Sequence, residues 1–235
     1  MDVTTYVAGY NFTTDMNQIS LNLGAEELDN TTFGSGGWRT RVAGLKDVEA
    51  ELAGYWQAGS PSLDSEAFTR LGLADEVVSM SPTGVEGDTA YVWRGEKFGY
   101  DAFGSIGELT PFSLSMKGSH GQGAARGTFL KTRANVSATG ATGTSFRIIG
   151  GIPSGFALYS SFHVFTAGTT ITALVESDDA NTFASATTRL THGPITAVGG
   201  TIQRIAGPIT DDWFRVRVSA ITGTFSIACA IGVGV

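Results

Sequence analysis

The sequence has one cysteine, few charged residues and no long apolar run, and each scarcity excludes a class of protein. Cys229 is the only cysteine among 235 residues, which excludes an internal disulfide and a metal centre built from clustered thiolates. No run of residues approaches the roughly 20 apolar residues of a membrane-spanning helix. A charged fraction of 16% is far below that of coiled coils, whereas 32 glycines and 42% hydrophobic residues favour a folded, strand-rich chain.

Basic residues are also scarce, and their distribution divides the chain. The net charge of -7 argues against wrapping DNA or binding an anionic membrane, because both require clustered Lys and Arg. Residues 1–133 hold 17 acidic and 10 basic residues, whereas residues 134–235 hold 5 of each and no lysine. We therefore predict two domains, 1–133 and 144–235, joined by a small polar linker at 134–143. The start of the chain lacks a signal-peptide pattern, so we expect it to stay in a cytosol.

Alternation of apolar and polar residues predicts strands in both parts. Over residues 45–55, Val48, Ala50 and Leu52 alternate with a second set of side chains. That second set is acidic and shares one face of the strand: Asp47, Glu49 and Glu51. Further strands are predicted over 18–23, 77–80, 89–93, 109–116, 127–133, 156–165, 170–176, 187–191, 201–205, 213–220 and 224–233.

A single helix is predicted over Ser62–Leu73, because Leu63, Ala67 and Leu71 repeat every four residues behind a serine cap. The predicted fold class is therefore mainly β. It combines an antiparallel sandwich or barrel that contains one short helix with a second, sandwich-like β portion.

The segment Asp29–Gly44 is rich in glycine and too long for a tight hairpin, so it predicts a functional or mobile loop. Its aromatic and basic residues are Phe33, Trp38, Arg39 and Arg41. The two aromatic side chains are either part of the core or anchors for a neighbouring subunit. The acidic row at 47–51 is likewise either an ordinary solvated face or a surface that repels a polyanion such as DNA.

Each candidate motif for catalysis or metal binding is better explained as an ordinary structural feature. The three histidines lie in separate segments without metal-binding spacing. Residues 151–155 have the wrong order for a nucleophile elbow, and residues 121–127 have one residue too many for a dinucleotide fingerprint. The acidic doublets at 178–179 and 211–212 favour turns over calcium loops. We therefore predict no enzyme activity, no catalytic residue, no metal and no cofactor.

Several runs of residues resemble major tail tube proteins of long-tailed bacteriophages. The N-terminal run passes through Asn-Thr-Thr-Phe-Gly at 30–34, Gly-Leu-Lys at 44–46 and Gly-Tyr-Trp at 54–56. Residues 81–88 and 107–113 are similar to the middle of such proteins. Residues 175–185 and 209–216 resemble the β-rich C-terminal part often found in them, so the resemblance spans nearly the whole chain.

This resemblance implies a structural virion protein that forms stacked, typically hexameric rings in the phage tail after assembly in the host cytoplasm. Genome DNA would pass through the tube without specific binding, and the partners would be further copies, the tape measure, the tail terminator and the distal tail protein. Asp47, Glu49 and Glu51 become candidates for the lumen. Phe33, Trp38, Arg39 and Arg41 become candidates for an inter-subunit loop, and Asp2–Tyr10 and Asp29–Gly44 for ring-to-ring contacts. Residues 144–235 would either decorate the tube exterior or complete the tube domain.

An alternative function belongs to a different class. Residues 144–235 could form a β-sandwich module that binds a host cell-surface glycan, with the first part as its anchor. Trp213 and Tyr159 would then serve as aromatic platforms for the sugar.

Overall fold

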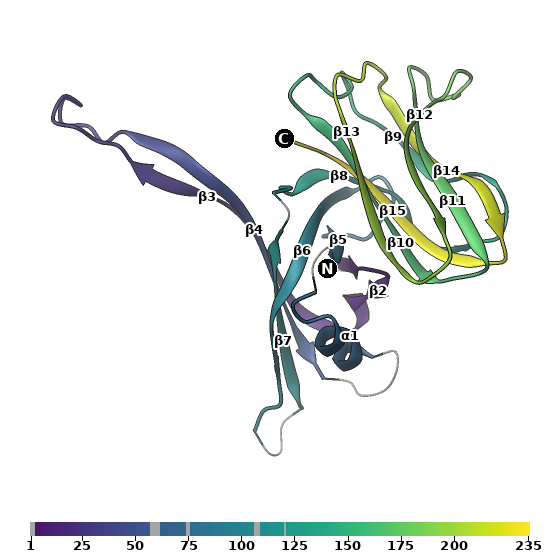
Figure 1. Ribbon diagram of the computed structural model, residues 1–235, viewed down its shortest axis with the longest axis horizontal. Helices are drawn as coiled ribbons and strands as arrows, with labels where there is room; N and C mark the ends of the chain where they lie inside the picture. Colours follow the sequence, from purple (N-terminus) through teal and green to yellow (C-terminus); the bar gives the residue numbers. More distant parts are fainter. Residues whose placement is uncertain (1–2, 57–61, 74–75, 106–108, 120) are drawn as a thin grey trace.

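The computed structural model describes residues 3–56, 62–73, 76–105, 109–119 and 121–235. Its elements confirm a mainly β fold with a single α-helix in the described ranges (Figure 1). In the N-terminal part these are β1 (Thr4–Val7), β2 (Tyr10–Asn11), a 3-10 turn (Phe12–Thr14), β3 (Met16–Asp29), β4 (Arg41–Tyr55), α1 (Leu63–Thr69), β5 (Glu76–Ser81), β6 (Thr89–Ala102), β7 (Pro111–Gly118) and β8 (Ala125–Val136). In the C-terminal part they are β9 (Gly140–Arg147), β10 (Ala157–Thr166), β11 (Thr170–Asp178), β12 (Thr187–Ile195), β13 (Gly199–Ala206), β14 (Trp213–Thr222) and β15 (Phe225–Gly234).

The strands form two antiparallel sheets. The larger has eleven strands in the order β13-β10-β15-β8-β6-β5-β1-β2, and a branch β7-β4-β3 also leaves β6. The smaller has the order β12-β11-β14-β9. Neither sheet closes into a barrel in the part of the chain described. No helix among the described residues is long and apolar enough to cross a membrane.

The C-terminal half is a β-sandwich, as predicted for this part of the chain. The four-stranded sheet packs against β10 and β15 through a core that includes Phe162, Phe214 and Phe225. Strand β15 has both faces buried. Its larger side chains, such as Ile227 and Ile231, enter this core, whereas Ala228 and Ala230 face a second core. The small residues let the two layers approach closely.

The second core joins the two halves of the chain. Tyr6, Val92 and Phe129 from the N-terminal part pack there with Tyr159 and Ile202 from the C-terminal part. Strand β15 also pairs with β8 over most of its length. The two predicted domains therefore share one sheet and one core.

The predicted linker at 134–143 has a different structure. Residues 134–136 end β8, residues 140–143 begin β9, and three residues connect them. Gly143 has a φ of +74°, and a Cβ there would lie 2.0 Å from the carbonyl oxygen of Leu130. The small residues of this segment let the chain pass closely from one sheet to the other. The segment is therefore part of the two sheets and is not a flexible linker.

A third core lies beneath α1. The helix begins at Ser62, whose hydroxyl accepts from the Ser65 N–H while the Ser65 hydroxyl accepts from the Ser62 N–H. It ends at Thr69, earlier than the predicted Leu73, because Leu71 forms a β-bridge with Lys97.

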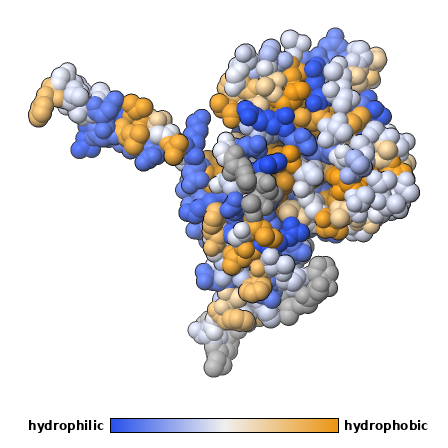
Figure 2. Space-filling view, in the orientation of Figure 1, coloured by the Kyte–Doolittle hydropathy of each residue, from blue (hydrophilic) through white to orange (hydrophobic). Residues whose placement is uncertain are grey.

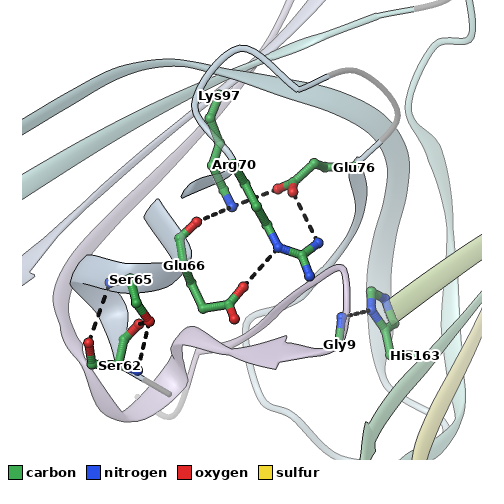
Figure 3. Close-up of polar contacts among 8 residues, drawn as sticks. All are labelled: Gly9, Ser62, Ser65, Glu66, Arg70, Glu76, Lys97 and His163. Atoms are coloured by element: carbon green, nitrogen blue, oxygen red, sulfur yellow. Dashed lines mark hydrogen bonds and ion pairs between the residues drawn. The ribbon is translucent and has the colours of Figure 1, made fainter. Parts of the chain in front are cut away.

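A buried ionic cluster ties α1 to the sheet (Figure 3). Lys97 and Glu76 are nearly inaccessible to solvent, and Lys97 Nζ lies 2.7 Å from Glu76 Oε2. Arg70 contacts Glu76 at 3.3 Å and Glu66 at 2.9 Å. Burial lowers the pKa of Lys97, and the Glu76 carboxylate opposes this shift. The pairing is what makes a buried lysine tolerable here.

Candidate functional site

Strand β4 has two chemically different faces. Val48, Ala50 and Leu52 are buried in the core beneath α1. The carboxylates of Asp47, Glu49 and Glu51 alternate with them on the opposite face. The strand therefore brings three acidic side chains together on one side of the sheet.

Neighbouring strands extend this acidic surface. Glu51 lies opposite Ser20 of β3 and Ser115 of β7, and Ser113 of β7 lies opposite Asp101 of β6. A shallow polar hollow forms among these strands. We call the whole surface the acidic face; its polar residues are Gln18, Ser20, Asp47, Glu49, Glu51, Asp101, Ser113, Ser115 and Lys117.

Lys117 is the cation of the acidic face, and it is neutralised locally. Its Nζ lies 3.0 Å from Glu49 Oε1. The hydrogen bond to Glu49 and the charge of Glu49 raise the pKa of Lys117, and Asp47 and Glu51 add to the effect. Sequence reasoning missed this residue, although Phe112, Leu114 and Met116 alternate with Ser113, Ser115 and Lys117 over β7.

Beyond the end of β7, strands β3 and β4 continue as a two-stranded projection, visible at the left of Figure 1. We call residues 24–47 the arm. The predicted loop at 29–44 is thus shorter than expected, since β4 already begins at Arg41. The exposed large apolar side chains of the arm are Leu28, Phe33, Trp38, Val42 and Leu45.

The tip of the arm is held by its own backbone. The Asn30 N–H donates to the Thr40 carbonyl at 3.1 Å, and the Thr40 N–H donates to the Thr31 hydroxyl at 3.0 Å. Arg41 forms an ion pair with Glu27 across the two strands. Phe33 and Trp38 remain exposed, so the reading that placed them in the core of this chain is wrong.

The N-terminal segment does not form a comparable projection. Residues 4–7, part of the predicted contact segment Asp2–Tyr10, form strand β1, which is buried and pairs with β2 and β5. Asp2 lies outside the described residues. The backbone groups of residues 4–7 are used within the sheet and their side chains are buried, so this strand offers little surface to a second ring. The ring-to-ring contact of Asp2–Tyr10 stays a prediction.

The proposed sugar platform is not available at Tyr159. This ring is 1% exposed, its hydroxyl donates to the Val235 carbonyl, and Arg204 lies over its face at 5.4 Å. Trp213 is half-buried at the start of β14. The two aromatic side chains named for glycan binding therefore offer no shared exposed surface.

Two of the three histidines are buried in neutral hydrogen-bond networks. His163 Nδ1 accepts from the Gly9 N–H at 3.4 Å (Figure 3), so Nε2 carries the hydrogen and donates to the Ser79 hydroxyl at 2.8 Å. Burial lowers the pKa of His163 to about 3 and that of His192 to about 4. His120 lies outside the described residues.

Groups that could bind metal are engaged elsewhere. Asp178 accepts from the Ala180 and Ser185 N–H groups, and Asp211 pairs with Arg189 at 2.8 Å. Among the described residues, no group of three His, Cys, Asp or Glu side chains could hold a metal ion. Cys229 is buried, and burial raises the pKa of its thiol to about 12.

Comparisons with known proteins give structural neighbours only. No family model matches the chain, and no curated protein matches it. A virion of a native gene transfer agent particle has a TM-score of 0.42 and 14% identity, over 52% of this chain and 95% of that chain. The tail of an empty gene transfer agent particle with C6 symmetry has a TM-score of 0.39 and 16% identity, over 48% and 81%. The SPP1 Dit protein, from a hub adsorption apparatus of phages, has a TM-score of 0.39 and 11% identity, over 97% and 98%.

Proposed function

We propose that the chain is a structural protein of the phage tail, the subunit of stacked hexameric rings that form the tail tube. The observation that carries this proposal is the acidic face. It is a hydrophilic sheet surface backed by an apolar core, and three carboxylates of one strand lie on it. The sequence resemblance described above supports the same assignment.

The acidic face suits the wall of a DNA conduit. Duplex DNA carries about one negative charge per 1.7 Å of its axis, so binding it requires clustered free cations. Lys117 is held by Glu49, which leaves Asp47, Glu51 and Asp101 as net negative charge. Like charge and small hydroxyl groups would let DNA pass without adhering.

An open sheet edge supplies a means of lateral assembly. In the described ranges, β3 pairs only with β4, so one edge of a 14-residue strand is left unpaired. The strand contains no proline to block pairing with another chain. We place the contact between neighbouring subunits of one ring at this edge.

The arm supplies a second contact between subunits. An isolated two-stranded hairpin is at best marginally stable in water, and this one also exposes Phe33 and Trp38. Arg39 directly follows Trp38 in the sequence, and Arg41 comes two residues later. We assign the four residues to contact with another subunit, and we assign the sandwich, which lies on the far side of the body from the arm (Figure 1), to the tube exterior.

Negative-stain electron microscopy of the purified, concentrated protein tests the assembly. We expect rings or tubes with a stain-filled bore, and a protein that stays monomeric at every concentration would contradict the proposal.

The lumen assignment is tested separately on the assembled tubes with Glu51→Lys. This variant should increase salt-sensitive binding of duplex DNA several-fold over wild type. Asp179→Lys, an exposed position in the sandwich, is the matched control and should leave binding near the wild-type level. Equal DNA binding by the two variants would remove the acidic face from the lumen.

A further inference from the structure

The turn between β1 and β2 packs directly on two strands of the C-terminal half. The turn consists of Ala8 and Gly9, and Gly9 has a φ of +84°. A Cβ on Gly9 would lie 2.4 Å from the Val164 carbonyl oxygen of β10 and 2.7 Å from the Gly199 nitrogen of β13. The position therefore requires glycine, and backbone lies against backbone. We call the packing of Ala8 and Gly9 on Val164 and Gly199 the turn contact.

One side chain connects the turn contact to the sheet. The Gly9 N–H donates to His163 Nδ1 at 3.4 Å (Figure 3). On the other side of the ring, the His163 Nε2–H donates to the Ser79 hydroxyl at 2.8 Å, and this hydroxyl lies 2.7 Å from that of Ser161. His163 thus joins the turn, β5 and β10 as a neutral ring with one acceptor and one donor nitrogen.

The hydrogen bond to Gly9 exists in only one protonation state of His163. A protonated imidazole carries a hydrogen on both ring nitrogens, so Nδ1 becomes a donor. It would then face the Gly9 N–H, which is also a donor, and the turn contact leaves the Gly9 backbone no room to rotate. A charged His163 is therefore compatible only with a turn that has moved away.

The surroundings of His163 do not favour a charged ring. The charged or titratable side chains on the elements packed around it are Tyr6 of β1, Glu76 of β5, Arg94 of β6, Arg133 of β8, His192 of β12 and Arg204 of β13. Glu76 is the carboxylate of this set, and it is paired with Lys97 and Arg70. Burial lowers the pKa of His163 to about 3, and the charge of His192 adds to this shift.

His163 is also shielded from solvent while the turn contact is closed. The side chain is completely buried. On the face seen in Figure 2, the N-terminal body and the sandwich form one continuous surface. Protonation is therefore coupled to opening of the turn contact.

We propose that His163 is an acid-sensitive latch: the neutral ring holds the β1–β2 turn against β10 and β13, and protonation releases the turn. Strand β15 stays paired with β8 and β10, so the release leaves the shared sheet in place. The attachment of β1 and β2 to the C-terminal half thus depends on pH. This inference does not depend on assembly into rings.

The release should grow with acidity by a factor that can be calculated. The latched ring stays neutral, whereas a released histidine has a pKa of about 6.5. The latch is therefore fully effective above pH 6.5 and weakens as the pH falls. Between pH 7.5 and pH 5 the released fraction should rise about thirtyfold.

Hydrogen exchange of the Gly9 amide, followed by NMR on the monomeric full chain, measures the released fraction. The exchange rate is divided by the intrinsic rate of an unprotected amide at each pH. We expect the corrected rate to rise about thirtyfold from pH 7.5 to pH 5. A rise of less than about threefold would overturn the proposal.

Two matched variants separate local release from global unfolding. His163→Gln keeps an acceptor and a donor but does not titrate, so the rise at Gly9 should disappear. His192→Gln removes the other buried histidine, which contacts Ser160 and Thr201 within the C-terminal half, and it should leave the rise unchanged.

Global unfolding exposes both histidines. If Gly9 exchanged only by that route, His192→Gln would reduce the rise as much as His163→Gln, and the latch would be refuted. Each rise is a ratio within one variant, so a change in stability at neutral pH does not alter the comparison. The wild type and His192→Gln are sufficient for this decision even if His163→Gln fails to fold.

Discussion

Mild acid should destabilise the monomer through His163 and His192. Both side chains are neutral in the folded protein, with pKa values of about 3 and about 4, whereas an unfolded histidine has a pKa of about 6.5. Between pH 7 and pH 5 the unfolded chain therefore takes up protons that the folded chain does not. Stability is present above pH 6.5 and is lost as the pH falls.

The surroundings of the two histidines determine how much unfolding free energy is lost in acid. His163 is surrounded by the neutral groups of Gly9, Ser79, Tyr6 and Phe165, and it has no carboxylate among its described contacts that would stabilise the imidazolium. His192 lies between the hydroxyls of Thr201 and Ser160, stacked on Phe162. Each group should lose about 1.4 kcal/mol per pH unit below 6.5, or about 2 kcal/mol by pH 5. The pair should lose about 4 kcal/mol, a large share of the 5–15 kcal/mol typical of a folded domain.

Urea unfolding followed by tryptophan fluorescence, at a concentration where the protein is monomeric, measures this loss. Unperturbed Asp and Glu side chains have pKa values of about 3.9 and 4.3, below this window, whereas that of histidine is about 6.5. His163→Gln keeps one acceptor and one donor but cannot titrate, and it should lower the loss between pH 7 and pH 5 by about 2 kcal/mol, whatever its stability at pH 7. The same holds for His192→Gln. A double variant that keeps the full pH dependence would refute the reasoning.

Three further changes test the fold. Glu76→Gln should cost about 3 kcal/mol because it leaves Lys97 buried without its counter-charge, and adding Lys97→Met should restore most of the loss; no recovery in urea unfolding would contradict this. Ser62→Ala should cost about 1 kcal/mol by removing the helix cap, and an unchanged unfolding midpoint would show that the cap contributes nothing. Gly127→Ala should cost about 3 kcal/mol because its Cβ would lie 2.0 Å from the Ile231 carbonyl oxygen, whereas Gly24→Ala on the open arm should have little effect; equal thermal midpoints would contradict the close packing of β8 on β15.

Most strands could be predicted from the sequence because one face of each is apolar. Val48, Ala50 and Leu52 predicted β4 and the acidic row on its other side, and all six strands predicted in the C-terminal part are present. Strand β1 was missed because its four residues are all buried and show no alternation. Strand β9 was missed because its Gly-rich and Thr-rich sequence also suits a linker.

The features that could not be predicted from the sequence depend on pairing between strands that are far apart in the chain. No local pattern reveals that β8 pairs with β15, about ninety residues later, so the two parts read as separate domains. The acidic row was visible in one strand, but its extension to Asp101 and Ser113 depends on the register of β6, β7 and β4. The arm was read as a loop because its outer strand residues lack a buried face, which is the signal that alternation depends on.

The central position of β15 has a consequence for synthesis of the protein. It is the last strand in chain order, yet it lies between β10 and β8 and contributes to two cores. While β15 is still being translated, neither core can close, and the early strands must wait for a partner far along the chain. A chain cut short before β15 would lack the strand that joins β10 to β8 and the side chains that β15 contributes to both cores. Incomplete products would thus stay partly unfolded, which makes them targets for degradation.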